Sequence, residues 1–322
     1  VNEVLQNPRV ARTLYYPYFH PNGIKEMVET RGLRSAFAVA QLLSSLAIGG
    51  VEERLNALRS LRLEVIDAAQ GPMPRNTARV LLQIMKELVR AFGDRRRQLE
   101  LAHEFREAIS GKPRVVRRRL RQYHLLEMPE EWNQIAFDDH VHDVNTKGRK
   151  SSTHLLMDAW IKGIRRLRII HYNFIEPRFA AELFAAARIL DIDVRIGIEF
   201  SACFRDKFVQ LIWVPRGFAD AQAFLCFLAE PQVMQLMEDG RHASAYQQEY
   251  VLALLRKFNA VHRIALNTRL GIELAPIDEA EFLGYVGIGQ KSKLHLSKFV
   301  YDKVLKLLQT RTFALGRELA AA

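Results

Sequence analysis

The sequence predicts an α/β protein in which an all-helical N-terminal region, residues 1–130, precedes a β/α domain, residues 131–322. Two observations lead to this prediction. Apolar residues follow a helical period as far as Arg121, and after Trp132 short β-type runs alternate with helical ones. Such alternation implies a parallel sheet or a barrel. Apolar residues make up 49% of the chain, which is enough for a sizeable core.

The N-terminal region is expected to hold four or five helices between residues 24 and 121. Apolar side chains there recur at steps of three and four residues, as they do on the buried face of a helix. Glycine and proline interrupt the pattern at 49–50, 71–74 and 111–113, so helix ends are predicted at these positions.

Four strands are predicted in the second part, at residues 135–140, 167–171, 194–200 and 208–214. Helical runs at 154–164 and 178–190 separate the first three. A helical stretch then covers 220–260, a less regular segment reaches 285, and a last helix is expected over 294–319. We therefore expect the β/α domain to carry a helical insertion at about 218–285.

The chain is basic, with 47 Lys and Arg against 36 Asp and Glu. On a predicted helix one face carries Arg114, Arg117, Arg118 and Arg121. That face could contact nucleic-acid phosphates, pair with acidic residues of the neighbouring domain, or simply be solvated.

The two cysteines, Cys203 and Cys226, form neither a disulfide framework nor a zinc ribbon, which indicates a reducing compartment. No apolar run reaches the roughly 20 residues of a membrane helix. Since no signal peptide is recognised either, we expect a cytoplasmic protein that does not enter the membrane.

Candidate metal ligands stand at the ends of three predicted strands. His140 and His142 are two residues apart, so on a strand both imidazoles face the same way. His171 closes the second strand, and Glu199 is a charge in the otherwise uncharged run from Ile196 to Ser201 of the third strand. A buried carboxylate needs a cation, either a metal or an arginine. Strand ends are also where β/α barrels place their sites.

The order and spacing of these segments resemble the metal-binding half of a PHP (polymerase and histidinol phosphatase) domain over residues 137–298. That family has an H-x-H strand, a Ser-led helix matched here at 151–163, and a strand ending like Ile169-Ile170-His171. A Gly-x-Glu-x-Ser strand follows, matched by Gly197, Glu199 and Ser201. Gly289 to His295 is similar to the Gly-Arg-x-His-type segment that follows a helical insertion in some members.

The resemblance implies a metal-dependent phosphoesterase on a partial or distorted PHP-type β/α barrel, with one to three divalent ions (Zn, Mn or Fe). It implies that His140, His142 and Glu199 bind metal, that His171 completes the metal shell, and that His171 and His295 act as catalytic residues. The implied substrate is a phosphorylated small molecule or a nucleotide.

The sequence departs from the family pattern at four places, one of which is the fourth strand, Phe208 to Trp213, where a histidine of the family is missing. Lys147 and the missing late motifs favour an alternative, a catalytically degenerate binding or scaffold protein. Lys147-Gly148 stands where the family usually has an acidic residue and glycine, and Ile170 replaces the Asp of the triplet. The sequence ends at Ala322, before the later His-Pro and Asp-x-His motifs. Either the natural chain continues or the domain has lost part of its site. A TIM-barrel amidohydrolase also begins with H-x-H, but its later ligands cannot be placed here.

Overall fold

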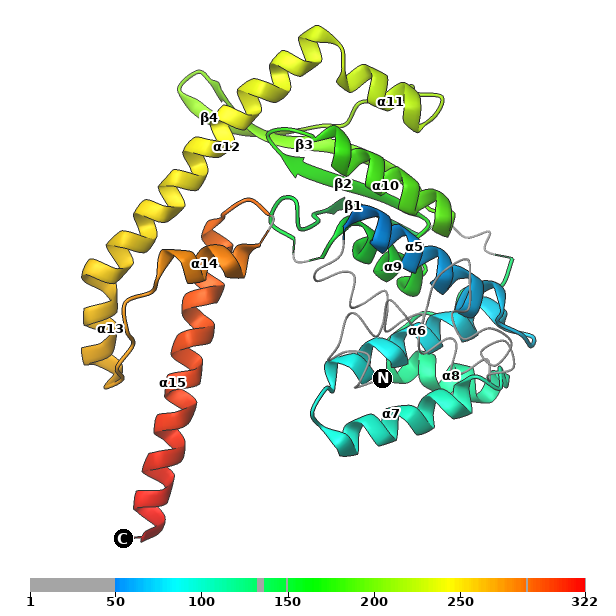
Figure 1. The fold of residues 1–322 in the computed structure, drawn as a ribbon, viewed down its shortest axis with the longest axis horizontal. Coiled ribbons are helices and arrows are strands. Elements are labelled where there is room, and N and C mark those ends of the chain that lie inside the picture. The colour runs from blue at the N-terminus through cyan, green and yellow to red at the C-terminus, as the bar shows by residue number, and fades with distance from the viewer. Residues whose placement is uncertain (1–49, 132–135, 149, 288, 322) are drawn as a thin grey trace.

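The computed structural model describes residues 50–131, 136–148, 150–287 and 289–321. Over these residues the protein is a mixed α/β structure, mostly helical, with one curled four-stranded sheet that forms half of a barrel (Figure 1). The N-terminal helices precede the strands, as the sequence predicts. The helices expected between residues 24 and 49 lie outside the described residues.

Helices begin and end near the predicted glycines and prolines of the N-terminal part. Pro74 and Pro113 are the first residues of their helices, where a missing backbone N–H costs nothing. Asp94 caps another helix, since its side chain accepts from the backbone N–H of Arg97 at 3.0 Å. In order the elements are α5 (Val51–Leu61), the π-helical segment η1 (Arg62–Asp67), α6 (Pro74–Arg90), α7 (Arg95–Ala108) and α8 (Pro113–Gln122).

Four strands in chain order make the sheet: β1 (Phe137–Val141), β2 (Arg166–Tyr172), β3 (Asp193–Phe204) and β4 (Lys207–Trp213). The first three are parallel and are joined by α9 (Ser152–Lys162) and α10 (Pro177–Leu190). Ser151 caps α9, and Gly163 ends it in a left-handed conformation, φ 83°. This is the predicted strand–helix alternation.

The fourth strand runs antiparallel to β3, so the expectation of a purely parallel sheet is wrong for β4. Arg205 and Asp206 form the two-residue turn of the hairpin, with φ of 49° and 59°. Two positive φ values match the twist of a tight hairpin, but this turn usually shows in a sequence as Asn-Gly or Asp-Gly. Because neither residue is glycine, the reversal carried no clear sequence signal.

One continuous core joins the N-terminal helices to the β/α part. It packs apolar side chains of α5 to α8 against α9, α10 and one face of β2 and β3, including Leu58, Leu81, Leu156, Ile169 and Ile196. Helices therefore cover this face of the sheet. Ile170, Gly197 and Glu199 alternate with the core residues, so they belong to the opposite face.

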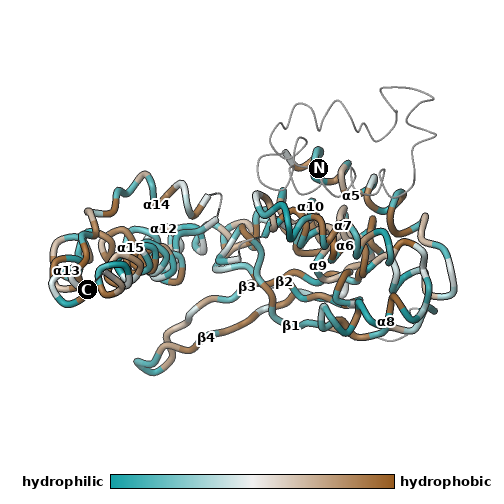
Figure 2. The backbone as a smooth tube through the Cα atoms, turned by 90° about the horizontal axis from the view of Figure 1, so that it is seen from below, coloured by the Kyte–Doolittle hydropathy of each residue, from teal (hydrophilic) through white to brown (hydrophobic). Residues whose placement is uncertain are grey.

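The main core also includes α11 and the start of α12, and from there α12 to α15 form an arm that extends away from α5 to α8 (Figures 1 and 2). The long helices α12 and α15 pack on each other, and with α14 they share a smaller core around Leu255 and Phe282. None of the described helices is both long and apolar enough to cross a membrane. Helix α11 (Ala221–Leu228) packs on α10, and the arm that follows consists of α12 (Pro231–Lys257), the π-helical segment η2 (Phe258–His262), α13 (Arg263–Leu270), α14 (Glu279–Val286) and α15 (Lys293–Ala321).

A buried ion pair crosses this common core. Glu182 on α10 accepts hydrogen bonds from Arg54 Nε on α5 at 2.9 Å, from Arg54 Nη2 at 2.7 Å and from Thr153 Oγ1 on α9 at 2.9 Å. The two charged side chains are only 10% and 2% exposed. Both carboxylate oxygens are therefore satisfied, and three helices are fixed to one group.

Replacing Glu182 with alanine is expected to destabilise the protein by about 3–5 kcal/mol, because Arg54 would remain buried without its partner. Chemical denaturation measures the difference. Glu100→Ala is the matched control, since its ion pair with Arg96 is exposed, and it should cost less than about 1 kcal/mol. If both substitutions lowered the free energy of unfolding equally, the buried pair of Arg54 and Glu182 would not have this stabilising role.

A second charged group lies between α6 and α9. Asp158 forms ion pairs with Lys86 and Lys150, and His154 Nε2 lies 3.8 Å from the same carboxylate. Burial, followed by the charges of Lys150 and Lys86, lowers the pKa of His154 to about 3. His154 is therefore held neutral among cations.

The depressed pKa of His154 should weaken the fold in mild acid. Below pH ~6.5, the ordinary pKa of histidine, His154 binds a proton in the unfolded state but stays neutral in the folded state. The free energy of unfolding therefore falls as the pH drops toward 3. From pH ~6.5 to ~5 this residue should remove about 1–2 kcal/mol. Urea unfolding at both pH values should show that His154→Gln loses less unfolding free energy between pH ~6.5 and ~5 than the wild type does. His103→Gln, which changes an exposed histidine, should leave the loss unaltered.

Candidate metal centre

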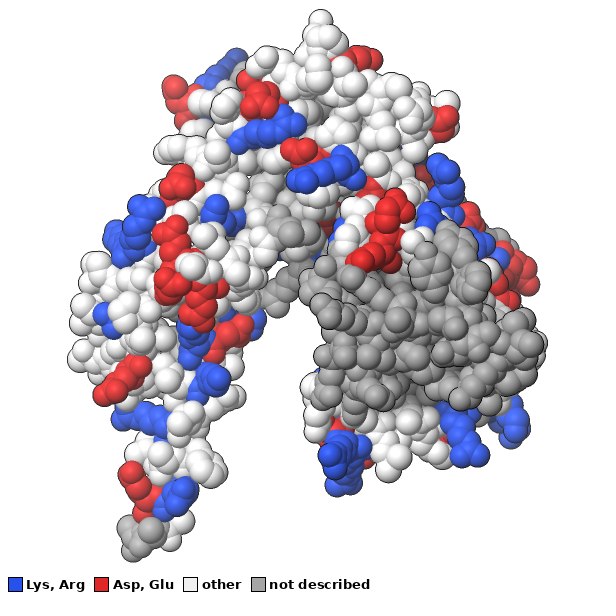
Figure 3. Space-filling view, in the orientation of Figure 1, with Lys and Arg blue, Asp and Glu red and all other residues white. Residues whose placement is uncertain are grey.

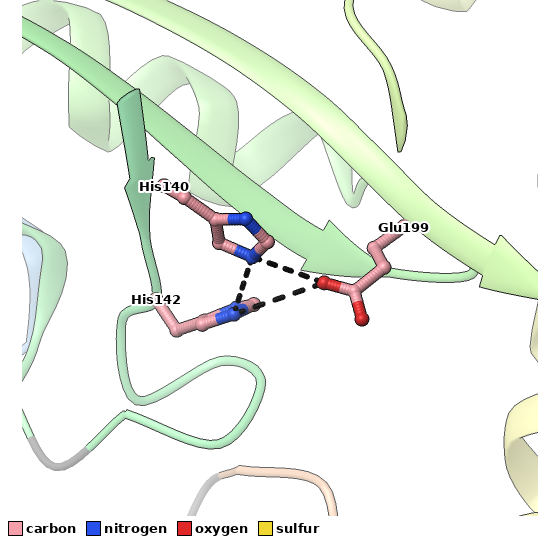
Figure 4. A group of neighbouring side chains, drawn as sticks. All are labelled: His140, His142 and Glu199. Carbon is pink, nitrogen blue, oxygen red and sulfur yellow. Dashed lines mark hydrogen bonds and ion pairs between the residues drawn. The ribbon is translucent and has the colours of Figure 1, made fainter. Parts of the chain in front are cut away.

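The structure brings three of the predicted ligands together: His140, His142 and Glu199 (Figure 4). His140 lies on β1, His142 directly follows that strand, and Glu199 reaches toward them from β3. Their ligand atoms all lie within 4.8 Å of one another. The i, i+2 spacing on a strand accounts for the two imidazoles facing one point, as the sequence predicts.

Distances within this group suit a small cation. His140 Nε2 lies 3.1 Å from His142 Nε2 and 3.0 Å from Glu199 Oε2, while His142 Nε2 is 4.0 Å from that oxygen. Ligands of a tetrahedral zinc ion lie about 3.3 Å apart, given metal–ligand bonds of about 2.0–2.1 Å. Three protein ligands would leave one position open for water or substrate. His140, with a side chain 43% exposed, lies at the open side.

Glu199 shows why this group favours a cation. The residue is only 5% exposed. Its Oε1 accepts a hydrogen bond from Gln210 Nε2 on β4, but its buried Oε2 has no hydrogen-bond donor. A buried carboxylate oxygen that faces two imidazole nitrogens is stabilised by a shared proton or a metal ion.

His142 is held in the orientation of a ligand. Its Nδ1 lies 2.7 Å from the carbonyl oxygen of Ile170, which can only accept, so Nδ1 carries the proton and Nε2 presents its lone pair to the group. Burial, followed by the charge of Lys147, lowers the pKa of His142 to about 4. A neutral imidazole can bind a cation without first releasing a proton.

Lys147 and Tyr172 line the same face. The Lys147 ammonium lies 4.6 Å from the centre of the Tyr172 ring, and that ring is 5.1 Å from the imidazole of His142. Tyr172 pairs with Glu199 in the register between β2 and β3. Tyr172, and not its neighbour His171, therefore shares the face of the sheet that carries Glu199.

His171 belongs to a separate buried cluster. Its Nε2 is 3.7 Å from Asp143 Oδ1, and the two residues are 2% and 0% exposed. Burial works to raise the pKa of Asp143, but the nearby His171 imidazole, followed by Ser152 and Asn145, outweighs burial and lowers it. The structure does not bring His171 into the group of three, and its proposed role in metal binding and catalysis stays a prediction.

Asp143 also fixes the loop that follows the two histidines. Its carboxylate accepts from the backbone N–H of Asn145 at 3.0 Å and from Ser152 Oγ at 2.8 Å. Its backbone carbonyl accepts from the N–H of Gly148 at 2.8 Å. A Cβ at position 148 would lie 2.3 Å from the carbonyl oxygen of His142, so only glycine fits this turn.

The predicted Gly289–His295 segment returns to this loop. The backbone N–H of Gln290 donates to the Thr146 carbonyl at 3.2 Å, and a Cβ at Gly289 would lie 2.2 Å from the Val144 carbonyl oxygen. His295 itself is buried at the start of α15 and is not one of the three grouped residues. Its catalytic role stays a prediction.

The predicted arginine face on α8 is partly neutralised. Arg117 forms a two-pronged ion pair with Glu127 at 2.9–3.0 Å, and Arg118 pairs with Glu107 at 2.7 Å. Arg114 and Arg121 remain exposed. Over the half formed by α12 to α15, Lys and Arg are interspersed with Asp and Glu (Figure 3). Nucleic-acid binding through α8 stays a prediction.

Two neighbours of the group, Gln210 and Tyr172, were not predicted from the sequence. Gln210 is a polar residue within an apolar strand, which is a weak signal of a buried partner. Tyr172 could be placed only once the register between β2 and β3 was known. No model of a known protein family and no curated protein sequence matches this chain.

The purified protein is expected to hold about one divalent ion, which the His140→Ala/His142→Ala double variant should lose. Elemental analysis of protein prepared without chelator or nickel resin measures this. Gln210→Ala, which releases Glu199, should weaken metal binding by about 10–100-fold. His103→Ala/His242→Ala is the control for chance binding, because these imidazoles are 71% and 78% exposed. Metal-free wild-type protein would contradict the site.

Proposed function

We propose that the protein is a metal-dependent hydrolase of the PHP type that acts on a phosphate ester. The observation that carries the proposal is the convergence of His140, His142 and Glu199 within 4.8 Å. Their spacing and order along the chain, together with the resemblance of residues 137–298 to the PHP family, support the reaction class.

The residues have separate roles in this proposal. His140, His142 and Glu199 hold a divalent ion, while Gln210 and the Ile170 carbonyl orient two of these ligands. A bound ion would supply a water of lowered pKa and polarise the phosphoryl oxygens. Lys147, whose charge reaches His142, would attract the anionic ester to the same face.

The second candidate is a binding or scaffold protein with a degenerate PHP-like domain. Lys147 favours it, because its ammonium lies beside the group at the position where the family usually has an acidic residue. A fixed lysine can take over the charge of a missing second ion but cannot activate a water as that ion would.

Hydrolysis of p-nitrophenyl phosphate by protein loaded with Zn, Mn or Fe tests the two candidates. His142→Ala should lower kcat/KM by at least about 100-fold, because a metal contributes several kcal/mol of transition-state stabilisation. His103→Ala, which changes an exposed histidine away from the group, should retain full activity.

A metal-loaded wild-type protein that hydrolyses none of a panel of phosphate esters would reject the hydrolase and support the scaffold. Activity that is unchanged in His142→Ala would show that hydrolysis arises elsewhere, for example from a contaminant.

A further inference from the structure

A pocket separate from the metal group lies where α10, the start of β3 and the segment before α11 meet. Its volume is about 500 Å³, within the range of small-molecule sites. Helix α11 packs on α10 beside it (Figure 1). Ile196 is the last β3 residue in its wall, so the pocket ends about 10 Å before Glu199, at about 3.3 Å per residue of strand.

Three arginines from three different elements line this pocket: Arg188 of α10, Arg195 of β3 and Arg216 of the segment before α11. Among the described residues, none of the three forms an ion pair. Arg188 and Arg216 are exposed, and Arg195 is half-buried. By alternation along β3, Arg195 shares the face of Gly197 and Glu199, away from α10. Arg188 and Arg216 line the pocket without carboxylate partners and favour a bound anion, above all phosphate, to which each guanidinium can donate two N–H groups.

The two acidic residues of the lining do not neutralise these arginines. Asp193 Oδ2 accepts from Arg166 Nε at 3.0 Å, outside the pocket lining. Asp220 Oδ1 accepts from the backbone N–H of Ala223 at 2.8 Å and thereby caps α11. Asp193 is already paired with a cation and Asp220 keeps its charge, so the positive excess of the lining comes from three arginines against two carboxylates.

The rest of the wall is aromatic. The ring of Phe224 stands edge-on to Phe184 and to Phe218, with centroids 5.3 and 5.1 Å apart. Phe224 is buried, whereas Phe184 and Phe218 are half-buried and offer ring surface to the pocket. Such a wall suits a flat ring that can stack or pack edge-on.

An open edge of the sheet completes the lining. Pairing with β4 begins only at Ile198, opposite Trp213, whereas pairing with β2 begins at Asp193. Residues 193–196 therefore line the pocket with an edge that no described strand covers. Backbone donors and acceptors on a free edge can recognise the polar rim of a heteroaromatic ring.

We propose that this pocket binds a nucleotide-sized phosphate ester of a flat heteroaromatic ring, with the phosphate on Arg188 and Arg216 and the ring against Phe184 and Phe218. The site is independent of the proposed hydrolase activity.

Calorimetric titration with adenosine monophosphate, adenosine and inorganic phosphate at ~0.15 M salt tests the proposal. Adenosine monophosphate should bind with a Kd of about 10–100 μM, and each fragment at least about tenfold more weakly. Arg216→Gln and Arg188→Gln should each weaken binding by about tenfold or more. Arg178→Gln removes the same charge from α10 outside the pocket and should change nothing.

The His140→Ala/His142→Ala variant separates this pocket from the metal group and should bind adenosine monophosphate as tightly as wild type. Loss of binding in that variant would place the ligand at the metal group and overturn the proposal. The proposal also fails if adenosine monophosphate does not bind at ~1 mM or if inorganic phosphate binds as tightly as adenosine monophosphate. It fails, too, if Arg178→Gln lowers the affinity as much as Arg216→Gln does. Circular dichroism of each variant confirms that it is folded.

Discussion

The fold depends on how one buried carboxylate is satisfied. Glu182 receives a two-pronged arginine from α5 and a hydroxyl from α9, so a helix of the N-terminal region is tied to both helices that cover the sheet. A carboxylate in an apolar core is tolerated only when its oxygens are paired. Because α9 and α10 set the positions of β1, β2 and β3, this contact also fixes the edge where the candidate ligands meet.

Much of this architecture could be predicted from periodicity and spacing. The helical N-terminal part and the alternation of strands and helices followed from local patterns, whereas the meeting of His140, His142 and Glu199 was an expectation from the resemblance to the PHP family. The position of His171 did not follow from local patterns, because it depends on the register of β2 against β3. That register pairs Tyr172 with Glu199 and turns His171 to the helix-covered face. Register is a long-range property that a single strand does not encode.

The two faces of the sheet therefore carry two polar clusters of different kinds. On the open face, a carboxylate and two imidazoles meet with one oxygen lacking a donor. On the covered face, Asp143 is fully hydrogen-bonded and holds the loop between the clusters. The first arrangement is suited to binding a cation and the second to holding a backbone in place. Their separation allows a rigid loop to support the ligands without competing for the ion.

The antiparallel fourth strand limits how this sheet can grow. A β/α barrel closes by repeating the same right-handed crossover, and each repeat brings another strand end to one rim. Reversal at Arg205-Asp206 interrupts that repetition, so β4 contributes Gln210 from its middle and no ligand from its end. On the side of β4, further groups at this rim therefore come from segments that return from outside the sheet. Residues 289–290, seated on the loop after the histidines, already take that route.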